Sequence, residues 1–308
     1  MSITRRNFVI TGAATVAASI LRPKADGMAS AKEALRVAAP TTGSRSTKKG
    51  LAGIAPLNSK LVTNWYYDWQ LHPATRGMPS VDPAIVFYPM CWGWRPTPPA
   101  GATSTNSQKP AADNSTPKGL MNLKTQNWKV LFGFNEPDHV DQANLSVEAA
   151  VKAWPALQGV AHELVGPSCA NPMGDWMAKF VPEIERQNLQ MDALGFHYYG
   201  SPSVEPFVAK LEAFYARYKR PVWVTEFAVA DWAAKDGKAL NRYSVEQVAE
   251  FMQSACSYMD KTPWIKGYAW FPTAGKHAAK GGNGPLITSM FYEDDGSLNQ
   301  LGRLYDTL

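Results

Sequence analysis

The feature that most constrains the fold is a regular alternation of short strand-like runs with helical stretches. Each run is rich in β-branched or aromatic residues, and apolar residues spaced three to four positions apart mark several of the intervening segments as helices. Eight runs occur, at residues 50–53, 61–67, 85–90, 130–135, 164–167, 193–198, 222–226 and 268–271. This order predicts a parallel sheet, and eight rounds predict a closed α/β structure, the (β/α)8 TIM barrel.

The length of the chain fits one barrel domain. Residues 51–308 come close to the size of about 250 residues that is typical of this fold. The clearest predicted helices are 147–161, 176–186, 204–218 and 244–259, the last with a capping signal at Ser244. Residues 95–119 are rich in Pro, Thr and Ser and fall where a helix should follow the third strand. We therefore expect an irregular insertion there.

The first residues resemble an export signal. Arg5 and Arg6 precede an apolar run, and the stretch 29–31 (Ala-Ser-Ala) offers a cleavage site. The paired arginines resemble a twin-arginine signal. The alternative is a membrane anchor, but the run of about 14 residues is shorter than the roughly 20 that span a bilayer. We expect residues 1–31 to be removed, residues 32–50 to form a polar linker, and the protein to be exported to the periplasm or outside the cell.

Charge and composition exclude some functions and favour others. The formal net charge is +5, and the first fifty residues carry nine basic against two acidic side chains, so the rest is slightly acidic. The sequence therefore gives no electrostatic indication of nucleic-acid binding, which would require a basic face on the folded part. Charged residues make up 19% of the chain, which has 11 tryptophans. This suits an uncharged ligand such as a sugar, although tryptophans also fill large cores.

The three cysteines favour neither a metal site nor a disulfide framework. Cys91, Cys169 and Cys256 form no Cys-x-x-Cys pair and no cluster at metal-ligand spacing. We interpret them as small buried apolar residues. No metal and no organic cofactor is expected.

Two predicted strands end in a glutamate. Residues 130–138 read Val-Leu-Phe-Gly-Phe-Asn-Glu-Pro-Asp, and residues 222–228 read Val-Trp-Val-Thr-Glu-Phe-Ala. A carboxylate beside an apolar strand is costly to desolvate, but barrel active sites lie at the C-terminal ends of strands. The alternative is two structural ion pairs. Two such glutamates in a Trp-rich chain with few charges favour a site made by Glu136 and Glu226.

Paired carboxylates across a cleft are the requirement of glycoside hydrolysis. One must stay protonated to donate to the leaving oxygen, and the other must be ionised to attack the anomeric carbon. In a retaining pair the carboxyl groups lie roughly 5–5.5 Å apart, against about 6.5–9.5 Å in an inverting pair. We expect the retaining distance. Because side chains alternate along a strand, Asn135 and Glu136 can both reach the cleft only where the strand end is irregular.

The motifs around both glutamates resemble glycoside hydrolase family 128, a family of retaining β-1,3-glucanases. Further matching pieces occur in the family's order at residues 64–69, 87–93, 139–146, 197–200 and 268–271. The resemblance implies that Glu136 is the general acid/base, that Glu226 is the nucleophile, and that Asn135 binds the hydroxyl next to the reacting carbon. It also implies that the substrate is β-1,3-glucan.

Other strand-end residues are candidates for substrate contact. His197 and Tyr199 share one face of the sixth strand, and either could hydrogen-bond the nucleophile, although His197 could equally be a satisfied core histidine. Trp65, Trp92 and Trp270 lie at the ends of the second, third and eighth strands and could stack on sugar rings, or could pack against loops. At most one of the adjacent Tyr66 and Tyr67 can face the cleft.

Two other functions stay open at this point. One is a secreted sugar-binding barrel that does not cut its ligand, although a binder needs neither glutamate. The other is a hydrolase of the same clan that acts on another β-linked polysaccharide. We expect a monomer without stable membrane insertion.

Overall fold

The computed structural model describes residues 45–55, 60–73, 84–94, 117–237, 239–271 and 284–308. The predicted signal, residues 32–44 of the predicted linker and nearly all of the predicted insertion lie outside the described residues. Among the residues described, no helix has the length and apolar character needed to cross a membrane.

Eight parallel strands form the predicted barrel. The sheet order is β3-β2-β1-β8-β7-β6-β5-β4. A parallel bridge between Met90 and Phe132, with a hydrogen bond of 2.9 Å from the Cys91 amide to the Phe132 carbonyl, joins the two outer strands. The strands are β1 (Lys49–Ala52), β2 (Trp65–Tyr67), β3 (Val86–Phe87), β4 (Trp128–Phe132), β5 (Ala161–Gly166), β6 (Ala193–Gly200), β7 (Val222–Val229) and β8 (Ile265–Trp270).

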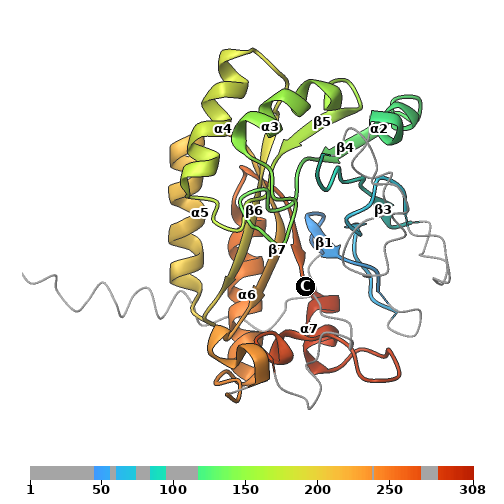
Figure 1. Ribbon diagram of the computed structural model, residues 1–308. Helices are drawn as coiled ribbons and strands as arrows, with labels where there is room; N and C mark the ends of the chain where they lie inside the picture. Colours follow the sequence, from blue (N-terminus) through green and yellow to red (C-terminus); the bar gives the residue numbers. More distant parts are fainter. Residues whose placement is uncertain (1–44, 56–59, 74–83, 95–116, 238, 272–283) are drawn as a thin grey trace, which may run out of the picture. The chain divides into compact units, whose positions relative to one another are not determined.

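Helices follow the strands from β3 onward in the described part of the chain. In Figure 1, α4, α5 and α6 lie outside strands β6 and β7. Two apolar clusters result, one between sheet and helices and one inside the barrel. The helices are α2 (Pro117–Leu123), α3 (Val147–Ala153), α4 (Asp175–Arg186), α5 (Val204–Tyr218), α6 (Val245–Lys261) and α7 (Gln300–Thr307), with 3-10 turns η3 (Trp154–Leu157), η4 (Trp232–Gly237) and η5 (Ile287–Ser289).

The predicted helices agree with the structure except after β4. Helix α5 has the predicted bounds, and α6 starts with the predicted capping box at Ser244 and Gln247. Helix α3 is shorter than predicted because Pro155 lies in a 3-10 turn that follows it, and β5 already begins at Ala161.

Two lysines at the start of β1 tie the strand to the last helices. The Lys48 ammonium donates to the carbonyls of Met259, Asp260 and Thr262 at 2.8–3.1 Å, where α6 ends. The buried Lys49 ammonium donates to the carbonyls of Tyr305 and Asp306 at 2.8 and 3.0 Å, where α7 ends. The barrel thus begins before residue 51, so the predicted end of the linker at residue 50 is too late.

The buried Lys49 predicts a specific pH dependence of stability. Burial, partly offset by Asp306, lowers the pKa of Lys49 to about 8. Between about pH 8 and about pH 10.5 the unfolded chain therefore binds more protons at this residue, and stability rises with pH. Relative to a Lys49→Met variant, the wild-type free energy of unfolding should rise by about 1–3 kcal/mol over this window. Urea unfolding of both proteins at several pH values measures this difference. Plots of the free energy of unfolding against pH that run parallel for the two proteins would contradict the prediction.

Candidate active site

Glu226 points into the barrel because β7 carries an irregularity beside it. The pairing of β7 with β8 shifts between Val224 and Phe227, and the pairing of β6 with β7 shifts between Phe196 and His197. Trp223 lies in the inner cluster, so strict alternation would turn Thr225 inward and Glu226 outward. The irregularity lets both of these successive side chains face inward. The Thr225 hydroxyl lies 2.8 Å from the Ser168 hydroxyl, and the Glu226 carboxylate accepts a hydrogen bond from Tyr67.

Glu136 reaches the same place from an irregular strand end, as the sequence predicts. Strand β4 ends at Phe132, and a single parallel bridge joins Asn135 to Ser168. Glu136 has a φ of 42°, in the left-handed region that non-glycine residues seldom adopt. Its amide donates to the Ser168 carbonyl at 2.7 Å. Strained backbone of this kind is concentrated at functional sites.

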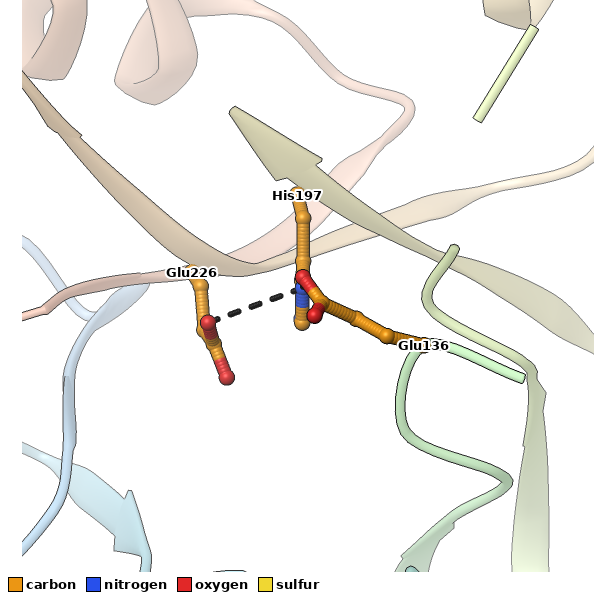
Figure 2. A group of neighbouring side chains, drawn as sticks. All are labelled: Glu136, His197 and Glu226. Carbon is orange, nitrogen blue, oxygen red and sulfur yellow. Dashed lines mark hydrogen bonds and ion pairs between the residues drawn. The ribbon is translucent and has the colours of Figure 1, made fainter. Parts of the chain in front are cut away.

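The two carboxylates converge on one histidine. One oxygen of Glu136, one of Glu226 and a ring nitrogen of His197 all lie within 4.8 Å of one another. Figure 2 shows the His197 imidazole between the two carboxylates. This separation is far below the roughly 6.5–9.5 Å of inverting pairs and near the roughly 5–5.5 Å of retaining pairs.

Three uncharged donors surround the carboxylate of Glu226. The Tyr67 hydroxyl and the Trp69 indole nitrogen each donate to Oε1 at 2.9 Å, and the Tyr199 hydroxyl donates to Oε2 at 2.5 Å. Burial and the charge of Glu226 hold the pKa of both phenols well above 10, so they remain donors. Because an ionised carboxylate only accepts hydrogen bonds, this shell fits its charged form.

His197 connects the two carboxylates. Its Nδ1 lies 2.9 Å from Oε1 of Glu136 and 3.6 Å from Oε2 of Glu226. Burial lowers the pKa of His197, but the charge of Glu226 and the hydrogen bond and charge of Glu136 outweigh it, and the net pKa is raised. The protonation of His197 is therefore coupled to the carboxylate pair.

Asn135 and Asp138 flank Glu136 in different ways. Asn135 is buried, its Nδ2 donates to Gln142 at 3.3 Å, and its Oδ1 has no partner among the described residues. That oxygen can accept a ligand hydroxyl. Both oxygens of Asp138 accept backbone amides, from Ala170 and Asn171 at 2.8 Å. Asp138 therefore holds the loop that follows β5.

Glu136, His197 and Glu226 could in principle hold a metal ion. The hydroxyl and indole hydrogens that point at Glu226, however, already offer positive charge to its two oxygens. The arrangement is thus suited to proton transfer and nucleophilic attack by the side chains themselves.

Comparison with known proteins decides the family. The sequence model described as the glycosyl hydrolase catalytic core matches residues 47–305. The chain belongs to this family. Within it, the resemblance to glycoside hydrolase family 128 that the motifs indicate is confirmed by solved structures.

Several proteins share the fold of this glycosyl hydrolase. A family 128 endo-β-1,3-glucanase from Amycolatopsis mediterranei, solved with laminaritriose, is 26% identical with a TM-score of 0.65, covering 84% of this chain and 98% of that one. An oligosaccharide-binding family 128 protein from Trichoderma gamsii is 21% identical with a TM-score of 0.59, covering 88% of this chain and 96% of that one.

One curated relative is the alkali-sensitive linkage protein 1 of Schizosaccharomyces pombe. It is 29% identical over 186 residues, which make up 57% of this chain and 32% of the relative. The hydrolase thus spans about a third of the length of that protein.

The tryptophans predicted to contact sugar do not lie where a ligand could stack on them. Trp65, Trp92 and Trp270 are 3%, 4% and 0% exposed. Trp65 and Trp92 pack inside the barrel of the hydrolase, whereas Trp270 packs outside it, with its indole donating to the Ser289 carbonyl at 2.9 Å. The prediction that these rings stack on sugar is wrong because neighbouring side chains cover both faces of each ring.

Three aromatic residues near Glu226 were not singled out as site residues from the sequence. Tyr67, the inward member of the Tyr66–Tyr67 pair, and Trp69 both bind the carboxylate. Phe271 lies edge-on to Trp69 and Tyr199, at 5.8 and 5.7 Å between ring centroids. The alternation of side chains along the strand already indicated that at most one of Tyr66 and Tyr67 faces the cleft. Trp69 could not be placed in this way because its φ is 60°.

Proposed function

We propose that this glycoside hydrolase is an endo-acting β-1,3-glucanase that retains the anomeric configuration. The observation that carries the proposal is the approach of Glu136 and Glu226 to within 4.8 Å across His197. The substrate is supported by the Amycolatopsis structure, whose ligand is laminaritriose.

The chemistry divides into two displacements. Glu226 Oε2 or Oε1 attacks the anomeric carbon while Glu136 gives its proton to the leaving oxygen, so the glycosidic bond breaks and a glycosyl ester forms. Glu136, now ionised, takes a proton from water, whose oxygen attacks the same carbon and releases Glu226. Tyr67, Trp69 and Tyr199 hold the attacking carboxylate in place. The free Oδ1 of Asn135 would accept the adjacent sugar hydroxyl.

A barrel that binds glucan without cutting it is the alternative from another class, and the Trichoderma protein shows that the fold supports binding. Both carboxylates and their donors argue for catalysis here, because a binder gains nothing from a strained glutamate. The other alternative, a hydrolase of the same clan that acts on another β-linked polysaccharide, would use the same carboxylates and differ from this proposal in the shape of the cleft that selects the substrate.

Product analysis tests the proposal. The protein should release a series of oligosaccharides from linear β-1,3-glucan, with little product from mixed-linkage glucan and none from cellulose. Proton NMR of the first products should show the β-anomer. Initial α-anomer would contradict retention, and release of glucose alone would contradict endo action.

We further propose that the protein is exported through its twin-arginine-type signal and acts as a monomer. Fractionation of cells that express the wild type or an Arg5→Lys/Arg6→Lys variant tests export, because the variant should stay in the cytoplasm. Light scattering of the mature protein tests the monomer.

Replacing His197 by Asn should move the alkaline limb of the pH profile to lower pH. The raised pKa of His197 means that it holds its proton above about pH 6.5. This proton lies on the ring whose Nδ1 is 2.9 Å from Oε1 of Glu136, so His197 can supply it to that carboxylate. Asparagine can still hydrogen-bond to Glu136 but cannot take up a proton, so the variant lacks the group that supplies a proton on the alkaline side.

The measurement is kcat/KM on a laminari-oligosaccharide from about pH 4 to about pH 9. A Tyr199→Phe variant is the control, because it loses a hydrogen bond to Glu226 but no group that titrates in this range. It should be slower with an unmoved limb. A His197→Asn profile with the wild-type limb would count against the coupling.

A further inference from the structure

Trp232 is an exposed aromatic ring at the rim that holds the carboxylates. All eleven tryptophans lie in the described part of the chain, and Trp232 is the one with an exposed side chain, at 54%. It begins η4, directly after β7, the strand that carries Glu226. A single exposed apolar side chain needs no functional explanation by itself, so what matters is where this one lies and what holds it.

The segment that carries Trp232 is held firmly. The carboxylate of the fully buried Asp231 accepts three hydrogen bonds from Arg242. The donors are Nε at 2.9 Å, Nη2 at 2.7 Å and the backbone amide at 2.9 Å. The Asp231 amide donates to the Pro285 carbonyl at 2.8 Å. The Trp232 indole nitrogen reaches the Tyr199 carbonyl at 3.4 Å. A ring that is already fixed loses little conformational entropy when a ligand stacks on it.

Trp232 is also next to the reacting groups. Its ring lies edge-on to Tyr199, at 6.2 Å between centroids and 73° between planes. The hydroxyl of that same Tyr199 donates to Oε2 of Glu226. One aromatic ring therefore separates the exposed indole from the carboxylate that we propose as the nucleophile.

From these contacts we infer that Trp232 is a stacking platform for a glucosyl unit of the bound chain that lies beyond the two units flanking the scissile bond. The C–H face of a pyranose ring is apolar and flat enough to cover an indole, while its hydroxyls stay in water. The inference rests on the proposed function, since it assigns a binding residue to the same cleft. It also predicts a preference for chains long enough to reach the ring.

The test is a chain-length series with Trp232→Ala. For laminari-oligosaccharides that reach the ring, kcat/KM should fall about 5- to 30-fold, whereas the shortest oligosaccharide that the enzyme cleaves should be affected less than about twofold. Trp232→Tyr should recover much of the loss. Met121→Ala, which removes another exposed apolar side chain from α2, is the control and should change nothing.

The outcomes separate this inference from the proposed function. Equal losses at every chain length, or no loss, would overturn the platform and leave the hydrolase intact. If the wild type cleaves no β-1,3-glucan, the proposed function fails, and the platform is then judged by binding alone. In that case calorimetry with laminarihexaose should show weaker binding to Trp232→Ala, and unchanged or absent binding overturns the platform as well.

Discussion

Replacing Glu226 by Gln should lower kcat on β-1,3-glucan by a factor on the order of 10⁴ to 10⁶, as the loss of a nucleophile does in other enzymes with covalent intermediates. The amide has nearly the same shape and can still accept from Tyr67 and Trp69 through Oε1. It cannot attack the anomeric carbon. The variant should therefore fold normally and still bind oligosaccharide, which calorimetry and thermal unfolding can measure beside the rate.

Glu163 offers a matched control for this substitution. It is a second glutamate on a barrel strand, β5, but its carboxylate accepts the indole of Trp223 at 2.8 Å and lies 3.6 Å from Lys266 rather than at the Glu136–His197 pair. Glu163→Gln should keep activity within a few-fold of the wild type. A Glu226→Gln variant that is as active as this control would rule out Glu226 as the nucleophile.

The fold and one strand of the site follow from simple sequence rules. Eight alternating runs predicted the barrel, and period-two alternation predicted that His197 and Tyr199 share a face. In the structure both point at the carboxylates, His197 to Glu136 and Tyr199 to Glu226. The prediction worked because β6 is long and its alternation holds across the residues that matter.

Predictions that required an exact register were less successful. For β8 we chose Trp270 as the inward residue, yet Ala269 belongs to the inner cluster, so Trp270 faces outward and Phe271 inward. A shift of one residue exchanges the two faces of a strand. The irregularity beside Thr225 likewise changes which side chains of β7 face inward, and no residue type in Val-Thr-Glu-Phe indicates it.

Trp65 was misplaced for a different reason. We predicted that a strand ends near it, whereas β2 begins there, paired with Gly50 near the start of β1. A Cβ on Gly50 would lie 2.2 Å from the Trp65 ring, and one on Gly267 would lie 3.2 Å from it. Two glycines on neighbouring strands thus leave the space that the indole fills. Only the register between strands reveals this complementarity.

Replacing Glu136 by Ala should lower kcat on β-1,3-glucan by about 10²- to 10⁴-fold, the usual contribution of a general acid/base. The loss should depend on the leaving group. The phenolate of an aryl β-glycoside with a very acidic phenol leaves without a proton. Formation of the glycosyl ester from this substrate should therefore stay fast. Water then attacks without a base, and the glycosyl ester of Glu226 should accumulate. Stopped-flow measurements should show a burst of phenol followed by a slow steady state.

An added nucleophile gives the sharpest reading of this prediction. Azide is small, needs no general base, and fits where the Glu136 carboxylate was removed, so it should speed the second step and give the β-glycosyl azide. An Asp138→Asn variant is the control, because Asp138 accepts loop amides at 2.8 Å rather than reaching the carbohydrate, and azide should not affect it. An α-azide from Glu136→Ala would mean that Glu136 lies on the α face of the sugar, where the nucleophile stands, and would overturn its assignment as the general acid/base.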